Sequence, residues 1–315
     1  MTNVYFDSAM DDDRRRERLY AGDIFVYSPT PATTALCEHA RRMVEEAFAP
    51  HDPRTVHRAV AVEECVNVLA RVKPQFIHHA RSKELIQQAL RELGCDPGKT
   101  YFDVPRLRSA MPQDYLTSGI AYAFHPHRDT WYSAPHLQLN WWLPVYNLEP
   151  ENCLAFHPGY FDRPVKNGSA SYNYYRWNAQ SRAAAAQHVK ADTRVQPKPE
   201  EPMDLDPQIR VIARPGSVIL FSGAQMHSTV PNSSGVCRYS IDFRTVNLDD
   251  AINRRGARNV DSACTGTTMR DYLSAVDLSR LPEAVIAMYD DGTENEGLLV
   301  YPAGQAEPST AARTG

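Results

Sequence analysis

The stretch "PGSVILFSGAQMHSTVPNSSGVCRYSIDFR", residues 215–244, carries the strongest fold signal in the chain. A short apolar run, "SVILF", enters a loop that ends in His227, and a second short run begins at Arg238. Short segments rich in β-branched and aromatic residues, bounded by Gly, Pro and Asn, are typical of antiparallel sheets. The stretch therefore predicts two strands joined by a loop that carries a histidine.

The run "RYSIDFR" (238–244) alternates with a period of two. On a strand, residues two apart face the same side. One face thus carries polar side chains, which are Arg238, Ser240, Asp242 and Arg244. The other face carries Tyr239, Ile241 and Phe243. We expect the apolar face to pack under helices and the polar face to look into a barrel.

Further segments of the same texture extend outward in both directions. They are "GIAYAF" (119–124), "HLQLNWWLPV" (136–145), "CLAFHPG" (153–159) and "RVIARPG" (210–216). Together these runs favour an antiparallel sandwich or barrel over alternating βαβ units. We expect a mainly β fold with helical support.

The flanking regions have a different pattern. Helical spacing of apolar residues predicts helices over 33–49 and 82–94, and a short strand is expected at 20–28. The charged run 11–18 is interpreted as a solvated segment. Residues 267–289 are expected to be helical and 303–315 to fray.

These segments together predict one catalytic domain over 1–315. Residues 1–116 would give mostly helical support and 117–247 the β core. Residues 161–208 would form a lid-like insertion in that core, and 248–315 would hold C-terminal helices and the tail.

Composition narrows the function classes. The 315 residues carry a net charge of −4, which gives no electrostatic reason to expect nucleic acid or a membrane as partner. The six cysteines lie far apart without a C-x-x-C pair, so reduced thiols in a cytoplasmic protein are expected. No apolar run approaches the roughly 20 residues that span a bilayer.

The stretch "HPHRDTW" (125–131) places His125, His127 and Asp129 on alternate residues. With His227 from the later loop, two imidazoles and one carboxylate match the ligand set of mononuclear non-haem Fe(II) oxygenases. That set leaves three adjacent coordination positions for a bidentate 2-oxo acid and dioxygen. His125 is the rival ligand, although Pro126 favours an extended conformation for it.

An inward Arg238 needs an anionic partner because an unpaired buried charge is costly. A dicarboxylate cosubstrate held by Arg238, with help from the Ser240 hydroxyl, would supply one. For Arg244, the expected partner is Asp242 on the same face.

Residues 117–247 resemble the phytanoyl-CoA dioxygenase-like group of Fe(II)/2-oxoglutarate oxygenases. The matching pieces are "HRD" (127–129), "ENCLAFHPGYF" (151–161), "PGSVILF" (215–221), "MHSTVPNSS" (226–234) and "RYS" (238–240). The resemblance implies a double-stranded β-helix of the jelly-roll or cupin-like kind. It departs from the family pattern at Cys153, where the family has Gly, and at Tyr160-Phe161, where the family has Ser-His.

Carried over by position, the resemblance implies iron ligands at His127, Asp129 and His227, and 2-oxoglutarate binding by Arg238 and Ser240. It implies Fe(II), 2-oxoglutarate and O2 as cofactor and cosubstrates, with 2-oxoglutarate converted to succinate and carbon dioxide while a C–H bond of a small molecule is hydroxylated. Related halogenases have Gly or Ala at the carboxylate position, so Asp129 predicts no halogenation. A role in natural-product metabolism is expected from the breadth of the family.

Secondary contacts are expected from one face of "HLQLNWW", where Gln138 and Asn140 would reach the cosubstrate or the substrate. Both side chains could equally form hydrogen bonds to neighbouring backbone groups instead. Candidate substrate residues are Trp131, Tyr172, Tyr174, Arg176 and Trp177. Packing of the tyrosine-rich stretch on the barrel rim remains the alternative.

Two other functions remain open. "RYSIDFR" also fits the Arg-x5-Arg pattern of nucleobase-demethylating oxygenases, although the net charge and the absence of a basic stripe argue against a nucleic-acid partner. The other is a metal- or ligand-binding β-helix protein without catalysis, against which the complete set of candidate ligands weighs.

Overall fold

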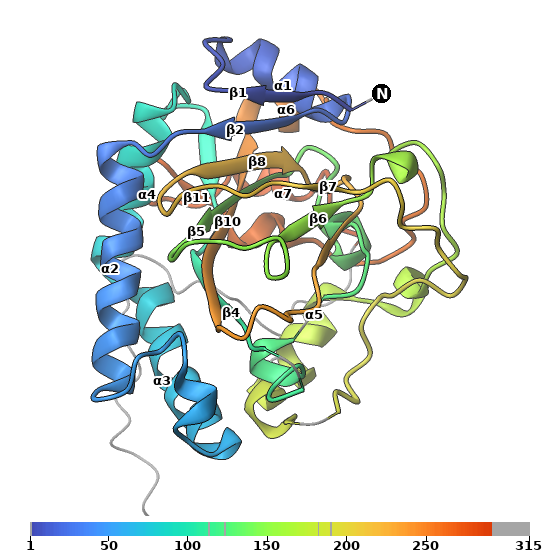
Figure 1. Cartoon of the computed structure of the whole chain (residues 1–315). Helices are drawn as coiled ribbons and strands as arrows, with labels where there is room; N and C mark the ends of the chain where they lie inside the picture. The colour runs from blue at the N-terminus through green and yellow to red at the C-terminus, as the bar shows by residue number, and fades with distance from the viewer. Residues whose placement is uncertain (1, 113, 123, 182, 190, 292–315) are drawn as a thin grey trace, which may run out of the picture.

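The computed structural model describes residues 2–112, 114–122, 124–181, 183–189 and 191–291 (Figure 1). The helices are α1 (Asp12–Tyr20), α2 (Pro31–Phe48), α3 (Val62–His78), α4 (Ala80–Glu92), α5 (Tyr174–Arg176), α6 (Leu248–Ile252) and α7 (Glu283–Ile286). The strands are β1 (Val4–Phe6), β2 (Ile24–Tyr27), β3 (Thr100–Phe102), β4 (Arg106–Ala110), β5 (Leu139–Pro144), β6 (Leu154–Phe156), β7 (Ile209–Arg210), β8 (Val218–Ser222), β9 (His227–Thr229), β10 (Arg238–Asn247) and β11 (Leu273–Ser274).

The strands form two sheets. The larger sheet has the order β1-β2-β8-β5-β10-β3-β11, and β4 pairs with β10 beside this path. The smaller sheet has the order β7-β6-β9. Within the larger sheet β10 lies between β4 and β5, antiparallel to both, and Asp242 stands opposite Arg106 on one side and Trp142 on the other. The larger sheet is mixed, since β1 and β2 are parallel while its other pairs are antiparallel, and this agrees with the expected mainly β fold with helical support.

The apolar face of β10 packs as its alternation predicts. Tyr239, Ile241 and Phe243 are buried in the main core together with Trp141 of β5, whose ring stacks on Phe243 at a centroid distance of 5.6 Å. The same core takes apolar side chains from α2, α3 and α4, which lie along one side of the sheet (Figure 1). The polar face of the strand is thereby turned away from the helices.

Two of the N-terminal helices follow the sequence prediction closely. α2 begins after Thr30, whose side chain accepts the backbone N–H of Thr33 in a capping box. α4 ends just before Gly94, which adopts a positive φ of 77° as a helix stop requires. α3 was not predicted as a separate element, although its buried residues fall at helical spacing; it contains Pro74.

The interpretation of residues 11–18 as a solvated segment is wrong. Asp11 is the N-cap of α1 and residues 12–18 lie in this helix, whose Arg15 and Arg16 are 3% and 5% exposed. Arg16 Nε lies 2.6 Å from Asp250 Oδ2, and the guanidinium also pairs with Asp12 and Asp13. The charges that cancel in the sequence are instead partly buried pairs that join the N-terminus to α6.

The strand expected over 119–124 is absent from the described residues of that stretch, 119–122 and 124. Gly119–Ala121 make a 3-10 turn, and Gly119 has a φ of 59°. A Cβ at Gly119 would lie 2.2 Å from the carbonyl oxygens of Ala185 and His188. The close approach of the 161–208 insertion therefore overrides the local strand preference of this stretch.

The C-terminal segment is also less helical than expected. Within 267–289 the structure has a 3-10 turn (Thr268–Asp271), the strand β11 and the short helix α7. The alanine-rich stretch 181–190 contributes a 3-10 helix at Ala183–Gln187. The predicted frayed tail, 303–315, lies outside the described residues. Across the described part of the chain, no helix has the length and apolar character needed to cross a membrane.

Candidate metal centre and cavity

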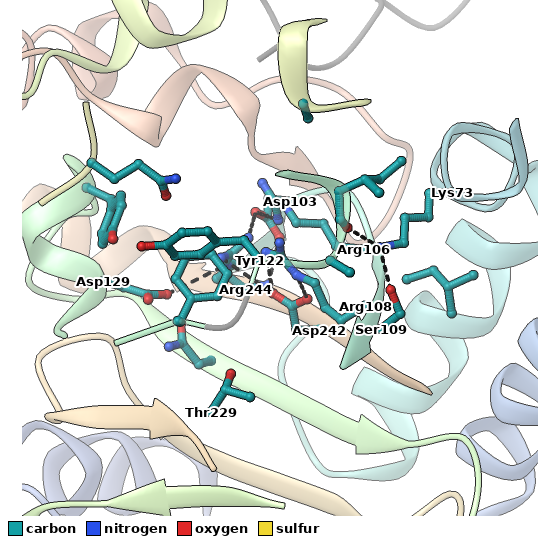
Figure 2. Close-up of a pocket in the computed structure, with 18 of the residues that line it drawn as sticks. Lys73, Asp103, Arg106, Arg108, Ser109, Tyr122, Asp129, Thr229, Asp242 and Arg244 are labelled. Atoms are coloured by element: carbon teal, nitrogen blue, oxygen red, sulfur yellow. Dashed lines mark hydrogen bonds and ion pairs between the residues drawn. The ribbon is translucent and has the colours of Figure 1, made fainter. Parts of the chain in front are cut away.

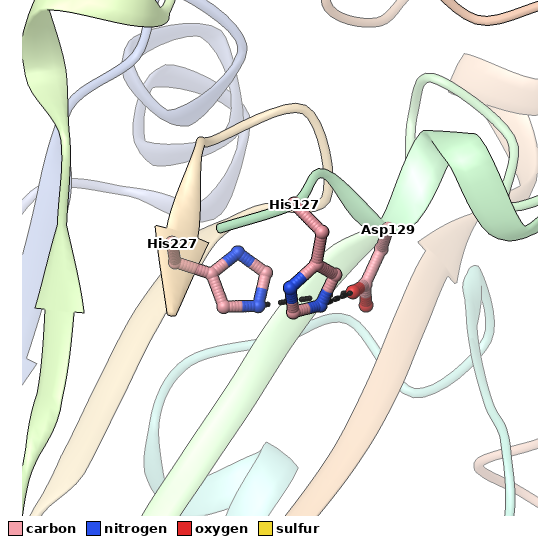
Figure 3. Close-up of side chains that lie close together, drawn as sticks. All are labelled: His127, Asp129 and His227. Atoms are coloured by element: carbon pink, nitrogen blue, oxygen red, sulfur yellow. Dashed lines mark ion pairs between the residues drawn. The ribbon is translucent and has the colours of Figure 1, made fainter. Parts of the chain in front are cut away.

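His127 and His227 are held side by side by their own backbones. The two residues form an antiparallel bridge in which each N–H donates to the carbonyl of the other, at 2.9 and 3.0 Å. The centroids of the two imidazole rings lie 4.3 Å apart, and the rings are drawn in Figure 3. Residues 100 positions apart in the sequence are thus set together by a backbone ladder, so the pair does not depend on flexible side chains for its position.

Asp129 completes the cluster from the turn that follows. Its N–H donates to Gly223 O at 2.8 Å, and Oδ1 lies 3.4 Å from His127 Nε2 and 3.8 Å from His227 Nε2. The intervening Arg128 points the other way, into a buried contact with Asp261 and with backbone carbonyls that include Ala224 O at 2.6 Å. The H-x-D alternation therefore puts two side chains into the cluster and one into the protein.

The three side chains can hold a metal ion. One ligand atom from each of His127, Asp129 and His227 lies within 4.8 Å of the others, and all three residues are buried. His127 Nδ1 lies 2.7 Å from His125 O, and His227 Nδ1 lies 2.9 Å from Gln225 O. Imidazoles whose Nδ1–H donates to a carbonyl present the lone pair of Nε2 to a metal. Burial also lowers the pKa of His227 to about 3, which favours the neutral ring that a metal requires.

The second oxygen of Asp129 is occupied by protein groups. Gln138 Nε2 donates to Oδ2 at 3.0 Å, and Arg244 Nε lies 3.6 Å from the same atom. Although burial alone raises the pKa of Asp129, the contact with His127 and the charge of Arg244 hold it well below its ordinary value. Oδ1 therefore remains the oxygen that faces the histidines.

Gln138 and Asn140 hydrogen-bond each other rather than neighbouring backbone. Gln138 Nε2 also donates to Asn140 Oδ1 at 2.8 Å, and Tyr272 OH donates to Gln138 Oε1 at 2.8 Å. Both residues line the cavity described below.

A cavity of about 590 Å³ opens beside this cluster (Figure 2). Arg238 lines it while being 6% exposed. Its Nη1 donates to Asn152 O at 3.1 Å, and its guanidinium lies 5.5 Å from the centroid of the Trp142 ring. Among the described residues Arg238 has no carboxylate within 4.0 Å, and its Nε and the Ser240 Oγ are buried without a hydrogen-bond partner. Burial lowers the pKa of Arg238 to about 10, which still leaves it charged at neutral pH.

Arg244 has the expected contact with Asp242 and two further carboxylate contacts. Its Nη2 lies 3.4 Å from Asp242 Oδ2 and its Nη1 lies 3.3 Å from Asp103 Oδ2, in addition to the contact with Asp129. These carboxylates raise the pKa of Arg244 above its ordinary value despite burial.

The predicted substrate residues divide into two groups. Tyr172, Tyr174 and Trp177 line the cavity. Arg176 is exposed and does not line it. Trp131 is 0% exposed, donates from Nε1 to Asp261 Oδ1 at 2.7 Å and packs with Tyr160 in a separate small core. The expectation that Trp131 faces the substrate is wrong. Its side chain, like that of Arg128, contacts Asp261 and does not line the cavity.

The rival ligand His125 is exposed, and it contributes its backbone carbonyl to His127. Several cavity residues were missed by sequence reasoning, among them Lys73, Asp103 and Tyr132. Arg106 and Arg108 also line the cavity. The alternation of "RLRSA" in β4 was the available signal for the two arginines, whereas Lys73 lies on a helix that was not predicted.

The cluster shares one cavity with Arg238, which has no carboxylate partner among the described residues, and its donor set is the one that a mononuclear non-haem iron site uses. The family model of phytanoyl-CoA dioxygenase (PhyH) matches residues 21–240, and the chain belongs to this family. The family uses Fe(II), 2-oxoglutarate and O2, and the cluster has the donor chemistry for such an ion. The expected resemblance is thereby confirmed over a longer stretch than the motifs themselves covered.

The solved structures that match this chain have low sequence identity to it. EvdO2 from Micromonospora carbonacea var. aurantiaca, complexed with 2-oxoglutarate, is 12% identical over 76% of this chain and 92% of its own, with a TM-score of 0.42. The carbocyclase SnoK from nogalamycin biosynthesis is 13% identical over 81% and 93%, with a TM-score of 0.41. The epimerase SnoN, in complex with Fe3+, alpha ketoglutarate and nogalamycin RO, is 14% identical over 75% and 84%, with a TM-score of 0.38. No curated protein matches the chain.

Proposed function

We propose that this protein is an Fe(II)/2-oxoglutarate-dependent dioxygenase that hydroxylates an unactivated C–H bond of a small molecule. The observation that carries this proposal is the coincidence, in one cavity, of the His127–Asp129–His227 cluster and a buried Arg238 that has no carboxylate partner in the described part of the chain. The first would hold Fe(II) and the second would hold the far carboxylate of 2-oxoglutarate. Membership of the phytanoyl-CoA dioxygenase family supports both assignments.

Each residue has a distinct task in this proposal. His127, Asp129 and His227 would bind the metal from one side and leave the cavity side open. Arg238 would pair with the distal carboxylate of the cosubstrate, and the Ser240 hydroxyl, which has no partner among the described residues, would donate to it. Gln138 would orient Asp129, with Asn140 as its hydrogen-bond partner. The two sheets would be the halves of a double-stranded β-helix, and 1–315 a single catalytic domain with 161–208 as a covering insertion.

Bound iron would supply the oxidation of 2-oxoglutarate to succinate and carbon dioxide that drives C–H hydroxylation. The protein's own residues would bind and orient the cosubstrate and the substrate, and would exclude water from the cavity. Asp129 supports hydroxylation over halogenation, since a carboxylate at this position occupies the place that a halide would need. A substrate from natural-product metabolism is the preferred assignment on the breadth of the family.

Cosubstrate binding tests the proposal without knowledge of the substrate. Fe(II) and then 2-oxoglutarate are added to the protein without oxygen, and the weak visible charge-transfer band of a chelated 2-oxo acid is recorded. We expect the band in the wild type, its loss in Asp129→Ala and a much higher 2-oxoglutarate requirement in Arg238→Met. The exposed Arg14→Met is the matched control. Tight metal binding with no band at any 2-oxoglutarate concentration would refute the oxygenase assignment.

A further inference from the structure

Lys73 places a buried ammonium group in the wall of the cavity. It lies on α3, is 8% exposed and lines the cavity that also contains the His127–Asp129–His227 cluster. Its Nζ donates to Ser109 Oγ at 2.9 Å and to the carbonyl of Ile120. Figure 2 shows Lys73 beside Ser109 at one end of a row of charged side chains, with Asp129 at the other end.

This ammonium group has no counterion among the described residues. No carboxylate oxygen there lies within 4.0 Å of Lys73 Nζ. The carboxylates of the same wall are already paired, since Asp242 contacts Arg108 and Arg244, and Asp103 contacts Arg106 and Arg244. Burying a cation without an anionic partner costs free energy. The charged form of Lys73 therefore has no carboxylate among the described residues to neutralise it.

Arg108 adds a second donor next to Lys73. Its Nε lies 2.6 Å from Asp242 Oδ1 and its Nη2 lies 3.3 Å from Asp242 Oδ2. This bidentate contact leaves Arg108 Nη1 without a hydrogen-bond partner in the described part of the chain. The Arg108 side chain is 33% exposed, and its guanidinium lies 5.6 Å from the centroid of the Phe124 ring. An anion in front of Lys73 would thus meet N–H groups from two side chains.

Aromatic rings connect this charged end to the metal cluster and to the insertion. Phe124 contacts both the His127 ring, at 5.0 Å between centroids, and the Tyr132 ring, at 6.3 Å. Tyr132 contacts Tyr172 at 5.3 Å, and Tyr172 contacts Trp177 at 5.9 Å. All of these rings line the cavity. They offer an apolar wall against which a flat or hydrophobic ligand can bury its surface.

We propose that the cavity takes a ligand with an aromatic or otherwise apolar body and one terminal carboxylate or phosphate, anchored by Lys73 and Arg108. That this ligand is the substrate rests on the proposed function. Its binding does not, because neither metal nor 2-oxoglutarate contributes to the anchor. The apolar body lies along the ring wall, and the anion supplies the counterion that Lys73 lacks.

Calorimetric titration of the metal-free protein tests the anchor with defined probes. The probes are 2-naphthoate, 2-naphthyl phosphate and the neutral 2-naphthamide, which share one ring system and differ in charge. We expect at least one anion to bind about tenfold or more tightly than the amide, as charged hydrogen bonds of this kind provide. Lys73→Met should lower the affinity for that anion to the affinity for the amide, and should leave the affinity for the amide unchanged. The stronger of the two anions identifies the terminal group.

Matched variants separate this site from the proposed cosubstrate site. Lys166→Met, at a side chain that is 72% exposed, should bind every probe as the wild type does. Arg238→Met should need much more 2-oxoglutarate in the charge-transfer test and keep the naphthyl anion in the titration. Lys73→Met should keep the 2-oxoglutarate requirement of the wild type and lose the anion. Thermal melts establish that both variants are folded. Equal binding of anions and amide, millimolar or weaker binding of both anions, or loss of the preference in Arg238→Met alone would each overturn the proposal while leaving the charge-transfer test of the oxygenase unaffected.

Discussion

The side-chain amide of Gln138 ties Asp129 to a tyrosine 143 positions further along the chain, because Gln138 Nε2 donates to Asp129 Oδ2 at 3.0 Å and Tyr272 OH donates to Gln138 Oε1 at 2.8 Å. The tyrosine fixes which end of the amide faces the carboxylate. Oδ2 of Asp129 thereby accepts a hydrogen bond from the protein, and Oδ1 faces His127 and His227. Contacts of this kind orient metal ligands and tune their affinity.

Gln138→Leu is therefore expected to weaken metal binding by about 10- to 100-fold without abolishing it. Leucine keeps the volume but leaves Asp129 Oδ2 without its N–H donor. Titration with Fe(II) or Co(II) under nitrogen measures the effect. The exposed Gln180→Leu is the control. An unchanged metal affinity in Gln138→Leu would mean that Arg244 alone holds the carboxylate.

Arg238→Met is expected to have opposite effects on stability and on cosubstrate binding. Without 2-oxoglutarate the variant loses a buried cation that has no carboxylate partner among the residues the structure describes, so its free energy of unfolding should rise by about 1–3 kcal/mol. Added 2-oxoglutarate should stabilise the wild type and not the variant. Urea denaturation with and without 2-oxoglutarate measures both effects. A variant that is destabilised in the absence of 2-oxoglutarate would show that the contacts with Asn152 and Trp142 outweigh the buried charge.

Lys73 is expected to make stability depend on pH in the alkaline range. Burial, followed by the charge of Arg108, lowers the pKa of Lys73 from 10.5 to about 7, while Cys65 and Asp242 act in the opposite direction. Between about pH 7 and about pH 10.5 the Lys73 side chain binds more protons in the unfolded chain than in the folded protein. The contribution of Lys73 to the free energy of unfolding therefore rises with pH in this range, by at most about 1.4 kcal/mol per pH unit.

The difference between wild type and Lys73→Met isolates this contribution, because the other titrating groups are common to both proteins. Urea denaturation at about pH 6.5 and about pH 9 should show the variant gaining less stability than the wild type on going to the higher pH. Lys166→Met should follow the wild type at both. A parallel pH dependence of wild type and Lys73→Met would mean that the lysine keeps an ordinary pKa.

Arg16→Met is expected to destabilise the protein by about 3–5 kcal/mol, since it removes one partner of a buried ion pair and leaves Asp250 without its closest cation. Tyr20 OH and Arg255 still contact that carboxylate, at 2.8 and 2.7 Å, so the lower end of the range is favoured. Equilibrium urea unfolding measures the change. Arg14→Met, on the exposed side of the same helix, should stay within about 0.5 kcal/mol of the wild type. Equal effects of the two substitutions would assign the loss to helix propensity instead.

Local patterns were sufficient to predict the parts of the site that lie on strands. The period of two in β10 separated Arg238 and Arg244 from Tyr239 and Phe243, and the structure keeps that division. The alternation of Gln138 and Asn140 with Leu139 and Trp141 holds for the same reason. Side-chain period follows from backbone geometry alone, so a single sequence can predict it.

What could not be predicted depends on contacts between distant residues. At the start of the strand expected over 119–124, Gly119–Ala121 form a 3-10 turn, because the carbonyl oxygens of Ala185 and His188 lie close to Gly119. The run 11–18 becomes a partly buried helix because Asp250, more than 230 residues away, receives Arg16. The position of Trp131 was wrong because strand alternation stops at Asp129, where a 3-10 turn begins. Neither composition nor spacing reports such pairings.

A single strand, β10, supports both proposed binding functions, with Arg238 at its start and Arg244 beside the metal cluster, six residues or about 20 Å along the chain. The strand therefore sets the distance between the proposed cosubstrate site and the metal cluster. A slip of one residue in its pairing would turn both arginines into the helical core and bring Tyr239 and Phe243 into the cavity. Changes in length within 230–237 are therefore expected to abolish cosubstrate and metal binding together, whereas selection can alter the length of 161–208 without changing that spacing.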